Sequence, residues 1–395
     1  MLDIYLLFNL KDGLVGKRMM TEKFSNSDEN PVLINLRNQY RFKIFIKVID
    51  ELPFQFQKRD FGIQTEIDSL QEIDLEYQLR PVERGEYEFG RLQVFVSSPF
   101  RLLSRRFTLS VKEKIAVYPS FIQMRKYEFL AISNKLNAYG LKKIRRIGHT
   151  MEFEQINEYV LGDDIRTINW NATAKHAKLM VNQYQDEKSQ PIYSLIDTGR
   201  LMKMPFDGLK LLDYAINSTL AFSNIALRKN DKAGMLTFSK TVENTIAASN
   251  KKTHLNIINE ALYAVDTNFS ESDFSLLYTH IKRKLSHRSL LMLYTNFEHI
   301  NGMRRQLPSI MALSKLHLLV VVFFENTELE GLINTNSEDI EDVYHKAIAE
   351  NFANEKQLIV KELQARGVHC ILTKPQSLTL NVINTYLEFK AKGLI

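Results

Sequence analysis

Between residues 30 and 118, apolar and polar residues alternate in short runs. The apolar residues of FKIFIKV (42–48) stand two apart, and those of LQVFV (92–96) repeat this spacing. A period of two residues places every second side chain on one face of a β-strand. Turn-forming residues at Arg84-Gly85 and at 97–99 separate such runs. The pattern therefore predicts an antiparallel β-sandwich, which forms an N-terminal domain over residues 1–118.

After residue 190 the pattern changes to continuous apolar runs separated by segments of helical length. Runs without polar alternation are typical of strands that are buried on both faces, as in a parallel sheet covered by helices. The predicted strands are 192–196, 232–238, 289–294, 316–324 and 368–372, and the helices between them include 211–228, 253–265 and 273–284. The pattern predicts a C-terminal, doubly wound α/β domain of Rossmann type over residues 191–395.

A connector over residues 119–190 joins the two halves. Its first part, FIQMRKYEFLAISNKLNAYG (121–140), is typical of a helix that ends at a glycine with a left-handed conformation. No low-complexity or proline-rich linker is present. We therefore expect a helical connector through which the two domains pack together.

Composition excludes several classes of protein. The 52 basic and 46 acidic residues leave a net charge of +6, which is too small to indicate a nucleic-acid partner. The single cysteine, Cys370, excludes an intrachain disulfide, and we expect its thiol to be inert in a buried strand. The longest apolar run, 316–324, is far shorter than the ~20 residues that span a bilayer. These features predict a cytoplasmic protein without a transmembrane helix.

The connector also contains an acidic turn, an arginine and the only tryptophan. Asp163 and Asp164 follow Gly162, where a turn or a helix N-cap is expected. Arg166 can bind a carboxylate or carbonyl oxygens with its planar guanidinium, and Trp170 is large enough to anchor an apolar seam. One hypothesis is that these residues fix the connector to the α/β domain, and the other is that they form a partner-docking surface. A hydrolase that uses the two aspartates is a weaker alternative, because adjacent side chains need not converge on one substrate.

Asp197 follows the first predicted strand of the α/β domain, at the edge where ligands bind in open α/β sheets. A magnesium ion there would need about six oxygen ligands. The loop DTGRL (197–201) supplies few of them, Asn296 follows the strand 289–294, and Arg200 would repel a cation. We therefore predict no metal ion. We expect Asp197 to hold its loop by accepting backbone N–H bonds or by pairing with Arg200.

Two segments resemble the DUF58 family. The connector reads Gly162-Asp163-x-x-Arg166-x-Ile168-x-Trp170, which is similar to the family's Gly-Asp-x-x-Arg-x-Ile-x-Trp signature. The segment RPVERGEYEFG (80–90) is similar to the family's Arg-Pro-x-x-Arg-Gly-x-Tyr stretch. The resemblance implies that the α/β domain is similar to a von Willebrand factor A domain.

That fold has a metal-ion-dependent adhesion site, abbreviated MIDAS, built from an Asp-x-Ser-x-Ser loop, a threonine and a second aspartate. In this chain Gly199 and Leu201 stand at the two serine positions, and Asn296 stands at the second aspartate. Thr253 is farther from Ala261 and Leu262 than the threonine of the metal-binding pattern would be. The resemblance therefore implies a degenerate MIDAS.

Members of the family usually begin with two transmembrane helices upstream of the point where this chain begins, so a position at the inner membrane face is expected if such an anchor exists. They are encoded beside MoxR-type AAA+ ATPases and other von Willebrand A proteins, which the resemblance implies as partners. We hypothesise a non-enzymatic adaptor that works with a MoxR-type ATPase in assembly or maturation of a protein complex at the membrane. The alternative is a metal-dependent adhesion module of MIDAS type.

No nucleophile elbow, His-Glu-x-x-His pair, P-loop or Gly-x-Gly-x-x-Gly turn occurs in the sequence. We therefore predict no catalytic residue, no metal ligand and no cofactor. The candidate partner-binding residues are Asp163, Asp164, Arg166, Trp170, Asp197, Arg200 and Asn296.

Overall fold

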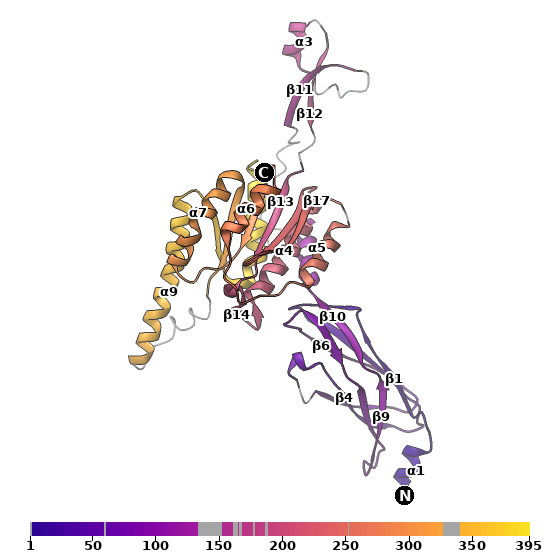
Figure 1. Cartoon of the computed structure of the whole chain (residues 1–395). Coiled ribbons are helices and arrows are strands. Elements are labelled where there is room, and N and C mark those ends of the chain that lie inside the picture. Colours follow the sequence, from indigo (N-terminus) through magenta and orange to yellow (C-terminus); the bar gives the residue numbers. More distant parts are fainter. Residues whose placement is uncertain are drawn as a thin grey trace.

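The computed structural model describes residues 2–58, 61–132, 152–160, 165, 168–176, 178–185, 189–251, 253–326 and 340–395. Figure 1 shows a domain of β-sheets next to an α/β domain, with the N-terminus at the far tip of the β-sheet domain. A hairpin projects from the α/β domain on the side away from the β-sheets. None of the described helices combines the length and the apolar character that crossing a bilayer requires.

The N-terminal domain consists of mainly antiparallel sheets that enclose one apolar core. Its sheets have the strand orders β1-β3-β6, β2-β10-β7 and β5-β4-β8-β9, and only β2 and β10 pair in parallel. Inward and outward residues alternate along β3, as the period of two predicts. The elements are α1 (Leu2–Phe8), β1 (Leu14–Met20), β2 (Lys23–Ser25), β3 (Asn30–Asn38), β4 (Ile44–Asp50), η1 (Phe54–Phe56), β5 (Gly62–Ile67), β6 (Glu72–Leu79), β7 (Gly85–Phe89), β8 (Leu92–Ser97), β9 (Ser104–Ser110) and β10 (Glu113–Tyr118).

The C-terminal domain is built on a mixed sheet with the order β17-β16-β13-β18-β19-β20. All neighbouring strands are parallel except β16 and β17. The strands are β13 (Pro191–Asp197), β16 (Lys232–Phe238), β17 (Val242–Ser249), β18 (Leu290–Tyr294), β19 (Leu318–Phe324) and β20 (His369–Thr373). The sequence predicted the five parallel strands within two residues at each end. It missed β17, an edge strand in which half-buried and exposed residues alternate.

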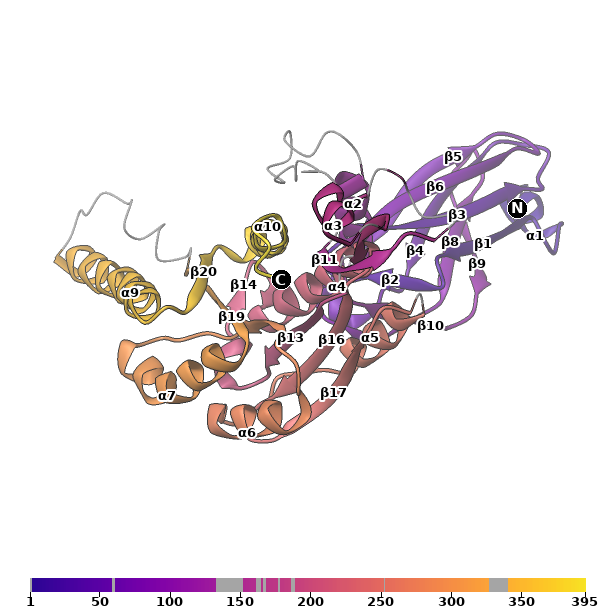
Figure 2. The same ribbon diagram turned by 90° about the horizontal axis from the view of Figure 1, so that it is seen from above.

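Helices cover both faces of this sheet (Figure 2). Consecutive strand residues enter two separate apolar cores, so both faces are apolar, as the continuous runs predict. On one face lie α4 (Leu211–Arg228), α5 (His254–Tyr263) and α10 (Leu378–Ala391). On the other lie α6 (Phe274–Lys284), α7 (Ile300–Leu316) and α9 (Ile340–Ala365). Short elements complete the domain: η4 (Arg200–Lys203), β14 (Pro205–Phe206), β15 (Leu209–Lys210) and η5 (Pro375–Ser377).

In its described residues the connector contains strands as well as helices, so the expectation of a helical connector holds only in part. Its helix α2 (Phe121–Ile132) packs against α4. The strands β11 (Glu152–Glu158) and β12 (Met180–Gln185) form an antiparallel hairpin, with the short helix α3 (Trp170–His176) at its end. We call β11, α3 and β12 the arm. The register of β11 shifts between Phe153 and Gln155, and this irregularity interrupts the alternation by which a strand is recognised.

The two domains contact each other directly, and Arg84 is central to this contact. Its Nε donates to Asp213 Oδ1 on α4 at 2.9 Å, and its two other nitrogens donate to the carbonyl oxygens of Leu262 and Val265. Nearby, the rings of Tyr118 and Tyr263 stack at 4.6 Å. The RPVERGEYEFG segment therefore joins the β-sheet domain to the α/β domain.

Candidate functional site

The candidate site lies at the carboxyl ends of β13 and β18, where the strand order reverses. From β13 the chain continues through α4 to β16 on one side, and it later returns to β18 on the other side. In open α/β sheets this switch point is where ligands bind. Asp197 is the last residue of β13, and Thr295 and Asn296 directly follow β18. The sequence placed Asp197 and Asn296 at this edge, and the structure confirms that location.

The carboxylate of Asp197 is buried and accepts three hydrogen bonds. Its Oδ1 accepts from the backbone N–H of Gly199 at 2.8 Å and from the hydroxyl of Ser272. Its Oδ2 accepts from the hydroxyl of Thr295 at 2.7 Å. Burial raises the pKa of Asp197, and these three donors oppose that rise because they favour the ionised form. Asp197 therefore holds three loops together at the end of the sheet.

Gly199 is required by the close packing around this carboxylate. A Cβ atom at residue 199 would lie 2.1 Å from the hydroxyl oxygen of Ser272 and 2.9 Å from Asp197 Oδ1. A serine at this position would displace one of these partners. The glycine that stands at a MIDAS serine position thus belongs to a different arrangement of the loop.

Arg200 does not pair with Asp197, which corrects one of the two roles expected for Asp197. The guanidinium of Arg200 is exposed and lies 3.9 Å from the carboxylate of Glu271. Asp197 is enclosed by its three donors, so no charged partner is needed to hold it in place. The other expected role, acceptance of a backbone N–H, is confirmed by the bond from Gly199.

The residues around Asp197 do not fit a divalent cation. Both carboxylate oxygens already accept hydrogen bonds, and the residue is only 3% exposed. Thr253 precedes α5 and is not among the donors to Asp197. Within the part of the chain that the structure describes, no three histidine, cysteine, aspartate or glutamate side chains gather as a metal site. A hard cation needs about six oxygen ligands, so this donor set is too small.

Asn296 accepts a hydrogen bond from a lysine, at the place where a MIDAS has its second acidic ligand. Lys356 Nζ, from α9, donates to Asn296 Oδ1 at 2.6 Å. Burial lowers the pKa of Lys356 to about 8, and the nearby carboxylate of Glu298 limits the fall. An ammonium at this place repels a metal cation.

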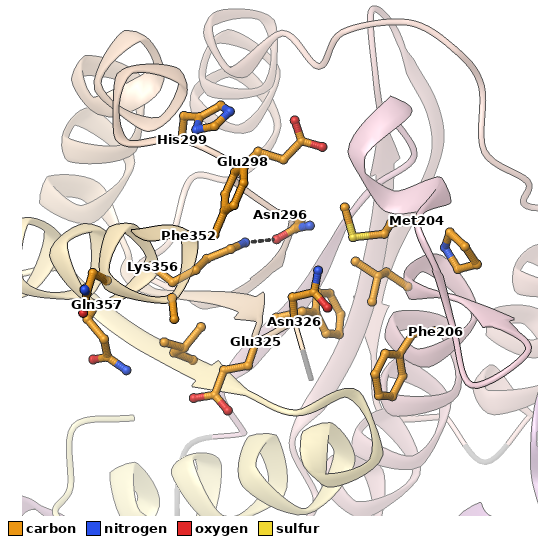
Figure 3. A pocket seen from close by; sticks show the side chains of 16 residues that line it. Met204, Phe206, Asn296, Glu298, His299, Glu325, Asn326, Phe352, Lys356 and Gln357 are labelled. Atoms are coloured by element: carbon orange, nitrogen blue, oxygen red, sulfur yellow. Dashed lines mark hydrogen bonds between the residues drawn. The ribbon is translucent and has the colours of Figure 1, made fainter. Parts of the chain in front are cut away.

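Next to Asn296 lies a pocket of about 630 Å³, seen in Figure 3. Lys356 and Asn296 point toward each other at one side of it. Apolar side chains from several elements line the rest, among them Met204, Phe206, Phe324, Phe352 and Leu372. The polar side chains Glu298, His299, Glu325, Asn326 and Gln357 also border it. None of the motifs considered in the sequence predicts this pocket.

Trp170 lies on the arm, away from any seam between domains. It is the first residue of α3, and its side chain is 69% exposed. The interpretation of Trp170 as a buried anchor of the connector is therefore wrong. Other apolar residues of the arm region are also exposed, namely Ile156, Val160, Ile165 and Leu179. Asp163, Asp164 and Arg166 lie outside the described residues.

Hydrogen bonds within the arm hold its short helix in place. The Asn169 side chain accepts from the backbone N–H of Ala172 at 3.0 Å and donates to Asn182 on β12 at 2.9 Å. The Thr173 hydroxyl accepts from the backbone N–H of Met180 at 3.0 Å. The arm therefore presents Trp170 on a defined scaffold.

Comparison with known proteins gives a family and a distant relative. Residues 155–342 match the family model described as protein of unknown function DUF58. The uncharacterized protein YeaD of Bacillus subtilis is 21% identical over 197 residues, which cover 48% of this chain and 49% of YeaD. The chain thus matches about half the length of this curated relative.

Two solved structures are similar to parts of the chain. The conserved hypothetical protein BatB from Bacteroides thetaiotaomicron has a TM-score of 0.35 at 14% identity, covering 51% of this chain and 99% of that chain. The CARDB domain of a Pyrococcus furiosus protein has a TM-score of 0.20 at 9% identity, covering 26% of this chain and 91% of that chain.

Proposed function

Because the chain belongs to the DUF58 family, whose model matches residues 155–342, we propose that it is a non-enzymatic interaction protein that acts as an adaptor. Its partner in this proposal is a MoxR-type AAA+ ATPase, and the pair would serve the assembly or maturation of a protein complex at the membrane. The α/β domain, as a von Willebrand A-like unit, would support the contacts. The family has no described activity, so the proposal depends on the surfaces of this chain.

The exposed tryptophan on the arm is the observation that carries the proposal. Tryptophan is enriched at the centres of protein interfaces, because it buries a large apolar area at low cost in conformational entropy. Trp170 stands on a hairpin that projects from the α/β domain (Figure 1). An exposed tryptophan contributes most to the free energy of binding when a partner covers it.

The strand-end crevice supports a role in recognition better than one in catalysis. Asp197 is enclosed by three hydrogen-bond donors, so it is not available as an acid, a base or a nucleophile. Burial raises the pKa of the Cys370 thiol to about 11, which keeps it in the unreactive protonated form. Arg200 and Glu271 are exposed beside the crevice and offer polar contacts at its rim.

One observation favours the alternative, a metal-dependent adhesion module. The hydroxyls of Ser272 and Thr295 gather around the Asp197 carboxylate, and hydroxyl and carboxylate oxygens are ligands that magnesium accepts. In that function a partner's carboxylate would complete the metal shell. The ammonium of Lys356 on Asn296 weighs against it.

A pull-down with the cognate MoxR-type ATPase tests the adaptor proposal. We expect the wild-type chain to retain the ATPase, and Trp170→Ser to reduce retention at least about tenfold, as for a central interface residue. Arg200→Glu should weaken retention less, since a rim charge contributes little. Phe54→Ser is the matched control, because Phe54 is also an exposed aromatic residue and lies on the β-sheet domain, away from the arm. Failure of the wild-type chain to retain the ATPase would contradict the proposal.

A further inference from the structure

The pocket beside Asn296 contains a cation, Lys356, with no carboxylate of the described residues within ion-pair distance; the carboxylate of Glu298 acts on it only from farther away. Lys356 Nζ donates to the neutral amide oxygen of Asn296, and no ion pair of Lys356 is present in the part of the chain that the structure describes. An ammonium that is partly withdrawn from water without a close ion-pair partner is less favourable than a solvated one. A ligand with a negative charge would supply the missing partner.

The side chains that line the pocket indicate that the ligand also has an apolar part. Met204 and Phe206 come from the segment after η4, Phe324 ends β19, and Phe352 lies on α9 one turn before Lys356. Met204 and Phe206 lie across from the Lys356–Asn296 pair, and Phe352 lies beside Lys356 (Figure 3). The volume of about 630 Å³ is in the range of pockets that enclose small organic molecules.

The other charged groups at the pocket limit the charge of the ligand. Glu298 and Glu325 border it, together with His299. Two carboxylates near one ammonium repel an anion with two or more charges, such as a phosphate monoester. A group with a single negative charge that binds at Lys356 meets less repulsion.

We propose that this pocket binds a molecule or chain end that joins an apolar body to one carboxylate. The carboxylate pairs with Lys356 Nζ, and the amide nitrogen of Asn296 donates to it as well. The apolar body contacts Met204, Phe206 and Phe324. Both a free organic monocarboxylate and the C-terminus of a peptide with an apolar last residue have this chemistry.

Isothermal titration with matched probes tests the proposal. The free carboxylates are 4-phenylbutyrate and octanoate, and 4-phenylbutanamide is the neutral counterpart of the first. A short peptide that ends in leucine, with either a free or an amidated C-terminus, represents the chain end. We expect saturable binding of at least one carboxylate probe, and at least about tenfold weaker binding of its amide. The probe that binds more tightly identifies the source of the ligand.

Two lysine variants of α9 identify the group responsible. Lys356→Met should reduce carboxylate affinity at least about tenfold, while the amide probe should bind as before. Lys361→Met is the matched control, because Lys361 is an exposed lysine on the same helix. This variant should bind the carboxylate probe with the same affinity as the wild type. Thermal melting confirms that both variants are folded. Carboxylate affinity of the wild type should also fall between pH 7 and 10, as Lys356 loses its proton.

Several results would overturn the proposal. They are the absence of saturable carboxylate binding at concentrations on the order of 1 mM, equal affinity for a carboxylate and its amide, and unchanged carboxylate affinity in Lys356→Met.

Discussion

Arg84 and Asp213 form an ion pair that joins the β-sheet domain to helix α4, with side chains only 6% and 4% exposed. The same guanidinium donates to the backbone carbonyls of Leu262 and Val265, so it joins the β-sheet domain to two segments of the α/β domain, α4 and the end of α5. A buried charge that is paired and hydrogen-bonded in this way becomes costly when its partner is removed. The relationship explains physically why an arginine stands in the RPVERGEYEFG segment.

Replacement of Arg84 by methionine should lower the free energy of unfolding by about 3 kcal/mol, because it removes the ion-pair partner of the buried Asp213 and one donor to each of two carbonyl oxygens. Urea denaturation measures this change. Arg80→Met is the matched control: Arg80 is exposed and donates only to the Ser27 carbonyl, so its effect should stay within about 0.5 kcal/mol. Equal effects of the two substitutions would show that the seam does not depend on Arg84.

Asp197→Ala should lower the free energy of unfolding by about 2–4 kcal/mol, because it leaves the Gly199 N–H and the Ser272 and Thr295 hydroxyls without an acceptor. Glu271→Ala, an exposed acidic residue in the same loop region, should change it by less than about 0.5 kcal/mol. Chemical denaturation of both variants provides the comparison. A loss in Asp197→Ala no larger than in Glu271→Ala would argue against the role of Asp197 as the link between three loops.

Magnesium and manganese should show no binding tighter than millimolar in isothermal titration of the wild-type chain. Asn296→Asp should not create a metal site either, because the new carboxylate would pair with the ammonium of Lys356, whose pKa it would raise. Titration of both proteins with the two metals is the measurement. A micromolar constant for the wild type would favour the adhesion module.

The pH dependence of stability should differ between the wild type and Lys356→Met. In the folded protein the pKa of Lys356 is about 8, which is below its ordinary value of 10.5. Between these values the unfolded chain binds more protons than the folded one, so the wild type gains stability as the pH rises through this window. Relative to Lys356→Met, the gain should reach about 2–3 kcal/mol by pH 10.

Denaturation at several pH values from 7 to 10 measures this difference. The exposed Lys361→Met serves again as the control, and it should follow the wild type at every pH. If the free energies of unfolding of the wild type and of Lys356→Met change with pH in parallel, Lys356 is solvated and its pKa has the ordinary value.

The sequence predicts the core of the α/β domain well, because strands buried on both faces are nearly free of polar residues. The bounds of β16 and α4 are those predicted, and the match of residues 155–342 to the DUF58 model confirms the resemblance seen in the connector signature. Elements with one exposed face were missed. The strand β17 lies at an edge, and a register shift in β11 obscures its alternation.

The candidate site was predicted only as far as local sequence determines it. Asp197 and the Gly199 N–H are two residues apart, so their bond follows from turn chemistry. Ser272 and Thr295 are 75 and 98 residues from Asp197, and nothing in the local spacing brings them together. Arg200 was expected to pair with its near neighbour, but its side chain extends to Glu271 instead.

One signal in the sequence could have indicated Lys356. It lies between Phe352 and Ile359 at the spacing that places residues on one face of a helix, and Ile359 is buried. A lysine in an apolar stripe indicates a buried amine that contacts other elements of the fold. The Asn296 partner is 60 residues away and could be assigned only from the structure.

We propose that the chain acts by contact with another protein through its arm, and the single tryptophan of the sequence allows this contact to be measured directly. With 5-fluorotryptophan incorporated, the chain has a single ¹⁹F NMR signal, which reports on residue 170. Unlabelled MoxR-type ATPase is then added up to a molar excess. We expect the ¹⁹F signal of residue 170 to shift or broaden as the ATPase covers Trp170. A signal that stays unchanged throughout the titration would contradict it.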